Sequence, residues 1–241
     1  MIKRMSVYSL KEGTDKDAFW KYHTQVHAPH IVEAAGPGQT KYIVNRVIKT
    51  AYGEPPCFGI VEQVFESEEA MNKYVEAMKT VKLPSGKTVF DDFGQRPELA
   101  SNATFLTEEF IVKDSGIKSY ATKGSKTIKR VFTTSPKEGT DKDAFWKYWT
   151  GQHAPDIIKA SGPGLLKYVL NRVAKVVYGE PKFFALMEMW YESEEAMNKD
   201  FETWKTLKLP SGESIFDDFE NRVTGSWAAT MEEFVAKDIT S

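Results

Sequence analysis

The chain has 241 residues, which is enough to bury a substantial core in one large domain or in two small ones. Its 32 basic and 34 acidic residues leave a net charge of −2, which argues against a nucleic-acid partner, because such a partner normally requires a basic face. The single cysteine, Cys57, excludes an internal disulfide and a paired-cysteine metal or redox motif. No apolar run is long enough for a membrane span or a signal peptide, so we expect a cytoplasmic protein without a membrane partner.

The sequence contains two copies of one unit. Residues 11–55 align without gaps to residues 137–181, an offset of 126, and 31 of these 45 positions are identical. Three further motifs recur in the same order, ESEEAMNK, KLPSG and FDDF. We therefore predict a first module over residues 1–113, a linker over 114–126 and a second module over 127–241, together forming a fused, pseudo-symmetric dimer.

Each module is predicted to contain four strands and two main helices. In the first module, segments rich in β-branched and aromatic residues place the strands at residues 3–10, 40–52, 57–65 and 104–112. The first helix is expected to begin with Thr14 as its N-cap and to run to about Val26. Pro29 lacks a backbone N–H and restricts Ala28, so we expect a kink or break at His27–Ala28, followed by a short helical extension.

Loops and a second helix complete each module. Residues 36–38, Gly-Pro-Gly, are predicted to end the first helical segment, and residues 53–56 to turn the chain between two strands. Ser67 is the expected N-cap of the second helix, and residues 82–93 are expected to hold a Pro-Ser-Gly turn and an amphipathic piece. The order β-α-β-β-α-β is the ferredoxin-like pattern. We predict an α+β fold in which two tandem ferredoxin-like sheets pack face to face or close into a barrel, with the helices outside.

Several motifs resemble the EthD-type group of the dimeric α+β barrel superfamily. In the first copy they are Phe19-Trp20-x-Tyr22, His27-Ala28-Pro29, the Gly-Pro-Gly loop and Lys41-Tyr42. In the second copy they recur as Phe145-Trp146, His153-Ala154-Pro155 and Lys167-Tyr168. This superfamily includes cofactor-independent monooxygenases, polyketide cyclases, lactone isomerases, aldoxime dehydratases and haem-dependent enzymes. The resemblance implies a pocket between the sheet and the helices of each module, and chemistry like that of the decarboxylases or dehydratases of polyketide pigment pathways.

All four histidines lie in this repeated motif, and histidine is the side chain best suited to proton transfer near neutral pH. His27 and His153 occupy matching positions, and we predict that they act as general acid/base groups at the mouth of a pocket. The alternative is a histidine that caps the last carbonyls of its helix. His23, His27 and His30 have the spacing of one helix face, but Pro29 should displace His30 and no carboxylate completes a ligand set, so no metal ion is expected.

The two copies differ at the positions that flank this histidine. His23 is replaced by Trp149 in the second copy, and His30 by Asp156. Asp156 is expected to orient His153 and raise its basicity, whereas the clustered imidazoles of the first copy should depress one another's protonation. Either both modules are active or one is catalytic and the other structural. The richer histidine cluster slightly favours the first module as the catalytic one.

A second set of residues is predicted to bind the substrate. Side chains near the motif are expected to form pocket walls that exclude water, namely Phe19, Trp20, Tyr22, His30, Tyr42, Trp149 and Tyr168. Asn45 and Asn171 are unusual in a buried strand, so they are expected either to point into the pocket or to bind a neighbouring loop. Glu62 and its counterpart Glu188 are either buried acids with a raised pKa or salt-bridge partners of Arg46 and its counterpart.

These features and the resemblance predict a cofactor-independent lyase of decarboxylase or dehydratase type. Its substrate would be an aromatic or polyketide-like small molecule, and histidine would provide acid/base catalysis. No cofactor is expected. The alternatives are an isomerase or cyclase, a cofactor-independent or haem-dependent monooxygenase, and a non-catalytic module that binds a hydrophobic intermediate. A homodimer of the two-module chain is compatible with each of them.

Overall fold

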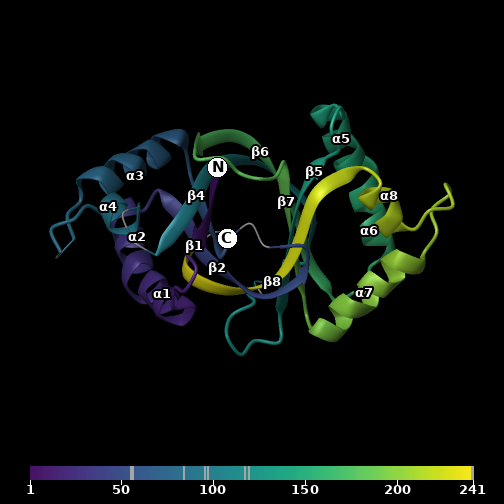
Figure 1. The fold of residues 1–241 in the computed structure, drawn as a ribbon, viewed down its shortest axis with the longest axis horizontal. Coiled ribbons are helices and arrows are strands. Elements are labelled where there is room, and N and C mark those ends of the chain that lie inside the picture. The colour runs from purple at the N-terminus through teal and green to yellow at the C-terminus, as the bar shows by residue number, and fades with distance from the viewer. Residues whose placement is uncertain are drawn as a thin grey trace.

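A computed structural model of the chain describes residues 1–54, 57–83, 85–94, 96, 98–116, 118 and 120–239. Within these residues, eight antiparallel strands close into one barrel, and helices lie outside it in two groups (Figure 1). The strands are β1 (Ile2–Leu10), β2 (Gln39–Tyr52), β3 (Gly59–Phe65), β4 (Leu99–Asp114), β5 (Ile128–Pro136), β6 (Leu165–Tyr178), β7 (Ala185–Tyr191) and β8 (Val223–Asp238). The predicted α+β barrel with external helices is therefore confirmed.

The strand order around the barrel is β1-β3-β2-β8-β5-β7-β6-β4. Each repeat supplies four neighbouring strands in the same relative order, with its last strand beside its first. The repeats join where β2 pairs with β8 and where β4 pairs with β6, so that Val44 lies opposite Phe234 and Phe110 lies opposite Leu170. Each repeat thus covers the sheet edges that the other would leave unpaired, which are otherwise sites of aggregation.

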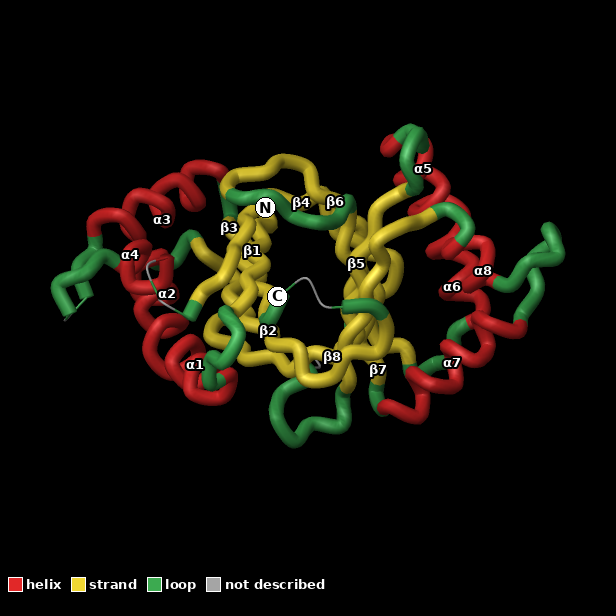
Figure 2. Tube along the Cα trace, in the orientation of Figure 1, coloured by secondary structure: helices red, strands yellow, loops and turns green. Residues whose placement is uncertain are grey.

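The helices cover only the outer side of the barrel, one group over each repeat (Figure 2). Over the first repeat they are α1 (Lys16–Tyr22), the π-helical turn η1 (His23–His27), α2 (Ala28–Ala35), α3 (Glu68–Thr80) and α4 (Val89–Gly94). Over the second they are α5 (Lys142–Tyr148), the π-helical turn η2 (Trp149–His153), α6 (Ala154–Ala160), α7 (Glu194–Thr206) and α8 (Ile215–Glu220). None of the helices described here is both long enough and apolar enough to cross a membrane.

The kink or break expected at His27–Ala28 occurs as a π-helical turn, and the helical segment is not interrupted. Ala28 keeps helical dihedral angles, φ −60° and ψ −42°, and its N–H donates to the carbonyl of His23, five residues earlier. The wider π-helical turn lets the chain pass the proline without leaving helical geometry. Ala154 donates in the same way to Trp149 in the second repeat. The histidine motif therefore lies within one continuous helical segment in both repeats.

Helix caps and loops agree in part with the sequence. Ser67 caps α3 as predicted, because its side chain accepts a hydrogen bond from the backbone N–H of Ala70. The cap of α1 is Asp15 rather than Thr14, and the Asp15 carboxylate accepts hydrogen bonds from two backbone N–H groups. The last strand of the first repeat begins at Leu99, earlier than expected. The predicted turns at 53–56 and 82–93 and the linker each include positions outside the described residues.

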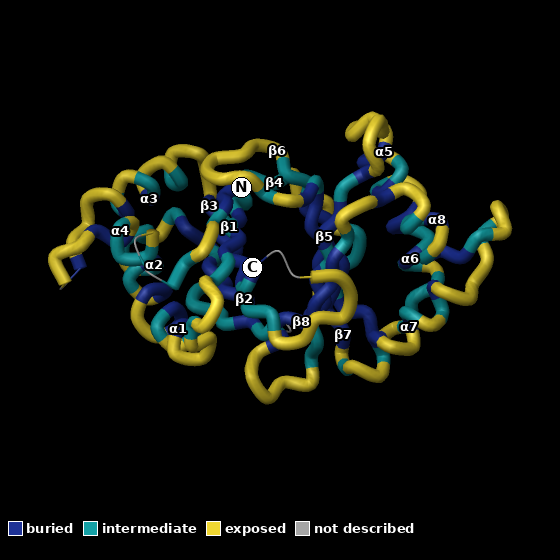
Figure 3. Tube along the Cα trace, in the orientation of Figure 1, coloured by how far each residue is buried: buried dark blue, intermediate teal, exposed yellow. Residues whose placement is uncertain are grey.

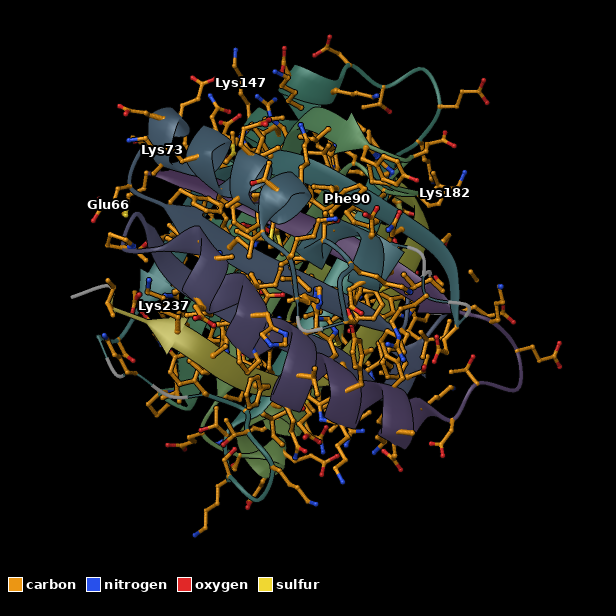
Figure 4. The ribbon with its side chains drawn as sticks, turned by 90° about the vertical axis from the view of Figure 1, so that its left-hand side faces the viewer. Glu66, Lys73, Phe90, Lys147, Lys182 and Lys237 are labelled. Carbon is orange, nitrogen blue, oxygen red and sulfur yellow. The ribbon has the colours of Figure 1, made fainter. Side chains whose placement is uncertain are left out.

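Strands β3 and β7 are buried almost along their whole length, whereas β2, β4 and β6 also have exposed stretches, which are yellow in Figure 3. One apolar cluster, which includes Met5, Val131 and Trp227, contains strand residues of both repeats and fills part of the barrel interior. Two other clusters pack the outer strand faces against the helices, one in each repeat. Charged side chains such as Lys73 project from the outer surface of the helices (Figure 4). A site between sheet and helices is therefore separated from the barrel interior by the sheet itself.

Candidate active site

The histidine common to both repeats ends each π-helical turn and is buried against the short helix that carries the FDDF motif. His27 and His153 are 4% and 5% exposed. His27 stacks on Phe93 of α4, with ring centroids 4.6 Å apart. His153 stacks on Phe219 of α8, with centroids 4.4 Å apart. These contacts hold each imidazole between the helix end and an aromatic ring.

Both imidazoles are neutral at physiological pH. Burial lowers the pKa of His153 to about 4, although the carboxylates of Asp218 and Asp156 oppose this shift. Burial also lowers the pKa of His27, against the opposing effect of Asp92, whose Oδ2 lies 3.8 Å from His27 Nδ1. Nδ1 of each ring lacks a hydrogen-bond partner among the described residues. Each ring can therefore accept or donate one further hydrogen bond, depending on its tautomer.

A carboxylate of the FDDF motif completes the surroundings of each histidine, and the sequence interpretation missed it. The hydroxyl of Tyr22 donates to Asp92, and the equivalent Tyr148 donates to Asp218. The His27 imidazole, with Tyr22, lowers the pKa of Asp92 to about 2. Although burial opposes ionisation, hydrogen bonds also lower the pKa of Asp218. The recurrence of both Tyr22 and the FDDF motif at the same offset of 126 residues was the available signal.

The predicted pairing of Asp156 with His153 is wrong. Asp156 Oδ1 instead accepts a hydrogen bond from Lys159 Nζ on the same helix, at 3.1 Å. The Asp156 carboxylate favours protonation of His153 only at a distance, and burial outweighs it, so the pKa falls rather than rises. The carboxylate of Asp218 acts more strongly on the imidazole than that of Asp156.

In the first repeat, His23 and aromatic side chains fill the space next to His27 between the sheet and the helices. His23 is fully buried, and its Nδ1 lies 2.9 Å from the hydroxyl of Tyr8. Phe19 and Phe58 pack around this pair, with ring centroids about 6 Å from that of Tyr8. Burial and the neighbouring His27 lower the pKa of His23 well below its usual value. The hydrogen bond and the surrounding rings close this site with protein side chains.

A cavity of about 280 Å³ lies at the matching place in the second repeat. Trp149 and His153 line it, together with residues of β5, β7, β8 and helices α6 to α8. Ala51 and Tyr52 at the end of β2 also line it, because β2 pairs with β8. Its aromatic lining consists of Tyr52, Phe132, Trp149, Phe201, Trp204, Phe216 and Phe219. The cavity favours the second repeat as the active one, which reverses the slight preference drawn from the histidine count.

Three predicted substrate-binding residues lie on the opposite side of the sheet. Asn45 is opposite Ile60 and Glu62 is opposite Met5, and both partners belong to the cluster inside the barrel. Asn171 Nδ2 donates to Glu188 at 2.9 Å in the same interior. Because side chains alternate between the faces of a strand, Asn45, Glu62 and Asn171 cannot reach the cavity next to the helices.

The interior carboxylates pair with lysines rather than with the arginines expected from the sequence. Lys129 Nζ is fully buried and lies 2.7 Å from both Glu62 and Glu188. Although burial opposes ionisation, Lys129 and Lys3 lower the pKa of Glu62 well below its usual value, so of the two alternatives the ion pair holds for Glu62, with lysines as partners. Burial and the neighbouring Glu62 do raise the pKa of Glu188. Arg46 instead pairs with Asp17 and Glu232.

The remaining predicted residues lie near the two histidine motifs, but most of them do not line the cavity. Tyr42 and Tyr168 are buried on the helix side of the sheet, in the clusters of their own repeats. Trp20 is half-buried, with the guanidinium of Arg46 5.0 Å from its ring centroid. His30 is half-buried on α2. Of the predicted residues, only Trp149 and His153 line the cavity.

Both sequence repeats match the model of one protein family. The EthD domain model matches residues 11–87 and 137–220, which is more than half of the chain. The chain belongs to the EthD domain family. Within the described residues of this EthD chain, no group of three or more His, Cys, Asp or Glu side chains is placed to hold a metal ion.

Solved structures share the fold at low sequence identity. An anthrone oxidase-like protein superposes with a TM-score of 0.60 at 14% identity, and the match covers 100% of the EthD chain and 95% of that protein. A putative monooxygenase from Lactobacillus acidophilus NCFM gives a TM-score of 0.52 at 11% identity, covering 98% and 95% of the two chains. No curated protein sequence matches the chain. At such identities the similarity shows a common fold.

The second-repeat site of this EthD chain combines a neutral base, an aromatic cavity and a fixed negative charge. His153 can take a proton from a ligand in the cavity, because it is unprotonated above a pH of about 4. The carboxylate of Asp218 would then stabilise the imidazolium electrostatically. Arg222 and Tyr148 hold Asp218 in its charged form through hydrogen bonds. The geometry therefore suits reversible proton transfer to an apolar ligand.

Proposed function

We propose that this protein is a cofactor-independent lyase of decarboxylase or dehydratase type, acting on an aromatic or polyketide-like small molecule. The cavity of the second repeat is its active site, and His153 moves the proton. One observation carries the proposal: a neutral, buried imidazole with a free ring nitrogen lines an aromatic cavity. General acid/base catalysis of this kind typically contributes a factor of about 10² to 10⁴ in rate.

The aromatic walls bind the ring system of the substrate and exclude water. Phe219 stacks on His153 and also contacts Trp149, and all three line the cavity, so a flat substrate there would lie beside the imidazole. In a dehydration, His153 takes a proton from substrate carbon and returns it to the departing hydroxide, which leaves as water. In a decarboxylation, His153 first takes the proton of a phenolic or carboxyl group of the substrate and then delivers it to the ring carbon from which CO₂ departs. The charge that develops on His153 is balanced by Asp218 in both cases.

In this proposal the first repeat has a structural role. The two repeats are a fused pair of ferredoxin-like modules, residues 1–113 and 127–241, joined by residues 114–126. The first closes the barrel and contributes Ala51 and Tyr52 to the wall of the active cavity. His23 and His27 stabilise the filled site of the first repeat instead of performing catalysis.

The matched histidines of the two repeats provide the test. Purified protein is incubated with a panel of hydroxylated aromatic acids and hydroxylated polyketide-like ketones, and CO₂ release and water elimination are followed by mass spectrometry. We expect His153→Gln to lower kcat at least about a hundredfold and His27→Gln to change it less than about threefold. Circular dichroism of both variants controls for folding. Equal losses in the two variants, or unchanged turnover in His153→Gln, would contradict this assignment.

A second candidate is a cofactor-independent oxygenase. The fold neighbours include proteins named anthrone oxidase-like and putative monooxygenase, and a neutral base in an aromatic cavity would also suit this chemistry. His153 would remove a proton from an electron-rich aromatic substrate, and the resulting carbanion would transfer electrons directly to O₂. An oxygen electrode separates the two candidates, since only the oxygenase consumes O₂ in step with product. An absorption spectrum of the purified protein tests separately for haem.

A further inference from the structure

A second unusual group lines the same cavity. Arg130 of β5 is 5% exposed, and its Nε and Nη1 have no hydrogen-bond partner among the described residues. The ring of Phe201 lies beside it, with its centroid 5.6 Å from the Arg130 Cζ. A buried guanidinium without a counter-ion is unfavourable, because desolvation of a charge has to be offset by pairing or hydrogen bonding.

The first repeat provides an internal acceptor for the corresponding arginine, although its Nε also lacks a hydrogen-bond partner among the described residues. Arg4 is the counterpart of Arg130, and its Nη1 donates to Oε1 of Gln63, the residue directly opposite on β3. In the second repeat the residue opposite Arg130 on β7 is Met189, which offers no comparable acceptor. One substitution between the repeats therefore removes the internal partner of the arginine in the repeat that has the cavity.

Nearby carboxylates do not replace the missing acceptor. Glu194 acts on Arg130 only at a distance, and it forms an exposed ion pair with Lys49 at 3.3 Å. Glu220 lines the cavity but interacts with Tyr52. Trp204 adds a second unpartnered donor to the lining, because its Nε1 is buried without a hydrogen-bond partner in the described part of the chain. The unpartnered buried side-chain atoms of this lining are therefore hydrogen-bond donors, apart from His153 Nδ1, whose role depends on its tautomer.

We propose that the ligand of this cavity is an aromatic carboxylate and that Arg130 binds its carboxylate group. The guanidinium would form charge-assisted, bidentate hydrogen bonds, the geometry for which arginine is best suited. Trp204 Nε1 provides a further donor along the cavity wall. This inference rests on the proposed function in taking the second-repeat cavity as the active site, and it narrows the substrate class to acids.

Two ligands of nearly the same shape, one a charged carboxylate and the other a neutral amide, test the proposal. 2-Naphthoate and 2-naphthamide are titrated into the full chain by isothermal titration calorimetry. We expect naphthoate to bind about tenfold to a hundredfold more tightly, the range that corresponds to a hydrogen bond with a charged group. Arg130→Gln should remove this preference, and the matched control Arg4→Gln should retain it. Equal binding of the two ligands by the unaltered protein, no binding of either, or a preserved preference in Arg130→Gln would overturn the proposal.

A second variant keeps the arginine and restores an internal partner. Met189→Gln places in the second repeat the residue that pairs with Arg4 in the first. We expect it to lower the affinity for naphthoate at least about threefold while leaving that for naphthamide unchanged. An unchanged affinity for naphthoate would count against the proposal, and thermal unfolding of each variant establishes that it is folded.

Binding and turnover separate this inference from the proposed function. His153→Gln should keep the preference for naphthoate, because Arg130 is intact in that variant. If the preference is found but no aromatic acid is converted, the proposed function fails and the carboxylate site stands. If turnover depends on His153 but Arg130→Gln still prefers the acid, the carboxylate site fails and the proposed function stands.

Discussion

The two repeats build the same scaffold but use the space between sheet and helices differently. In the first, Tyr8 extends from β1 to His23, and their hydrogen bond lies within a closed aromatic cluster. In the second, Thr134 and Trp149 occupy the matching positions. The Thr134 hydroxyl bonds to Ser226 at 2.9 Å on the sheet, and the cavity lies beside it. Side-chain volume at matched positions, more than the number of histidines, therefore decides where a ligand can bind.

The largest expected effect lies in the barrel interior that both repeats form together. Lys129 is fully buried and its Nζ contacts Glu62, Glu188 and Glu233. Lys129→Met leaves these carboxylates without their common cation, so we expect a loss of about 3–5 kcal/mol in the free energy of unfolding. Chemical denaturation measures it. The matched Lys3→Met should cost less, about 1–2 kcal/mol, because the side chain of Lys3 is 9% exposed and water can reach it. Losses of the same size would show that the two lysines are equivalent.

The next effect is a dependence of stability on pH. The pKa of His153 is about 4 in the folded chain and 6.5 when solvated. Between these values the unfolded chain binds a proton that the folded chain does not, so the free energy of unfolding falls as the pH is lowered through this window. The contribution of His153 reaches up to about 3 kcal/mol. Denaturation of His153→Gln between pH 7 and pH 4 should show a shallower decline than the unaltered protein. Parallel curves would mean that His153 is not desolvated.

A smaller effect is expected when the cavity of the second repeat is filled by the side chain that fills the matching space in the first. Thr134→Tyr introduces the side chain found at the equivalent position of the first repeat, where Tyr8 fills the space. We expect the affinity for naphthoate to fall at least about tenfold, corresponding to about 1.4 kcal/mol, because the new ring occupies part of the cavity. Calorimetry measures the affinity, and Thr134→Val is the control that adds no ring. Undiminished binding in Thr134→Tyr would place the ligand elsewhere.

The smallest expected effect concerns Tyr52, which belongs to the first repeat but lines the cavity of the second. Tyr52 is 49% exposed and interacts with Glu220, which raises the pKa of its phenol. Since exposed polar contacts contribute little, we expect Tyr52→Phe to change stability by less than about 0.5 kcal/mol. Its ligand affinity should change less than about threefold, because the ring remains in the wall. Tyr178→Phe, the counterpart in the first repeat, should change neither quantity. A tenfold loss of affinity in Tyr52→Phe would assign its hydroxyl a direct role in binding.

Much of the architecture followed from local sequence patterns. The strand segments, the Ser67 cap and the tandem order were predictable because they depend on alternation, capping chemistry and self-similarity over short distances. The form of the kink or break expected at His27–Ala28 could not be predicted, since a π-helical turn differs from a break only in the register of a few hydrogen bonds. The inward direction of Asn45 and Glu62 was also missed, because alternation tells which residues share a strand face but not what that face contacts.

The sequence by itself determined that two related units would form one α+β barrel, and that His153 and Trp149 belong to a repeated histidine motif. The tertiary structure alone decided that Asp218, not Asp156, influences His153 most strongly, and that Arg130 lost its partner to Met189. It also decided that the cavity opens over the repeat with fewer histidines. The reason is physical: burial, electrostatic neighbours and free volume arise from elements distant in the chain. Local patterns specify each element but do not specify what will pack against it.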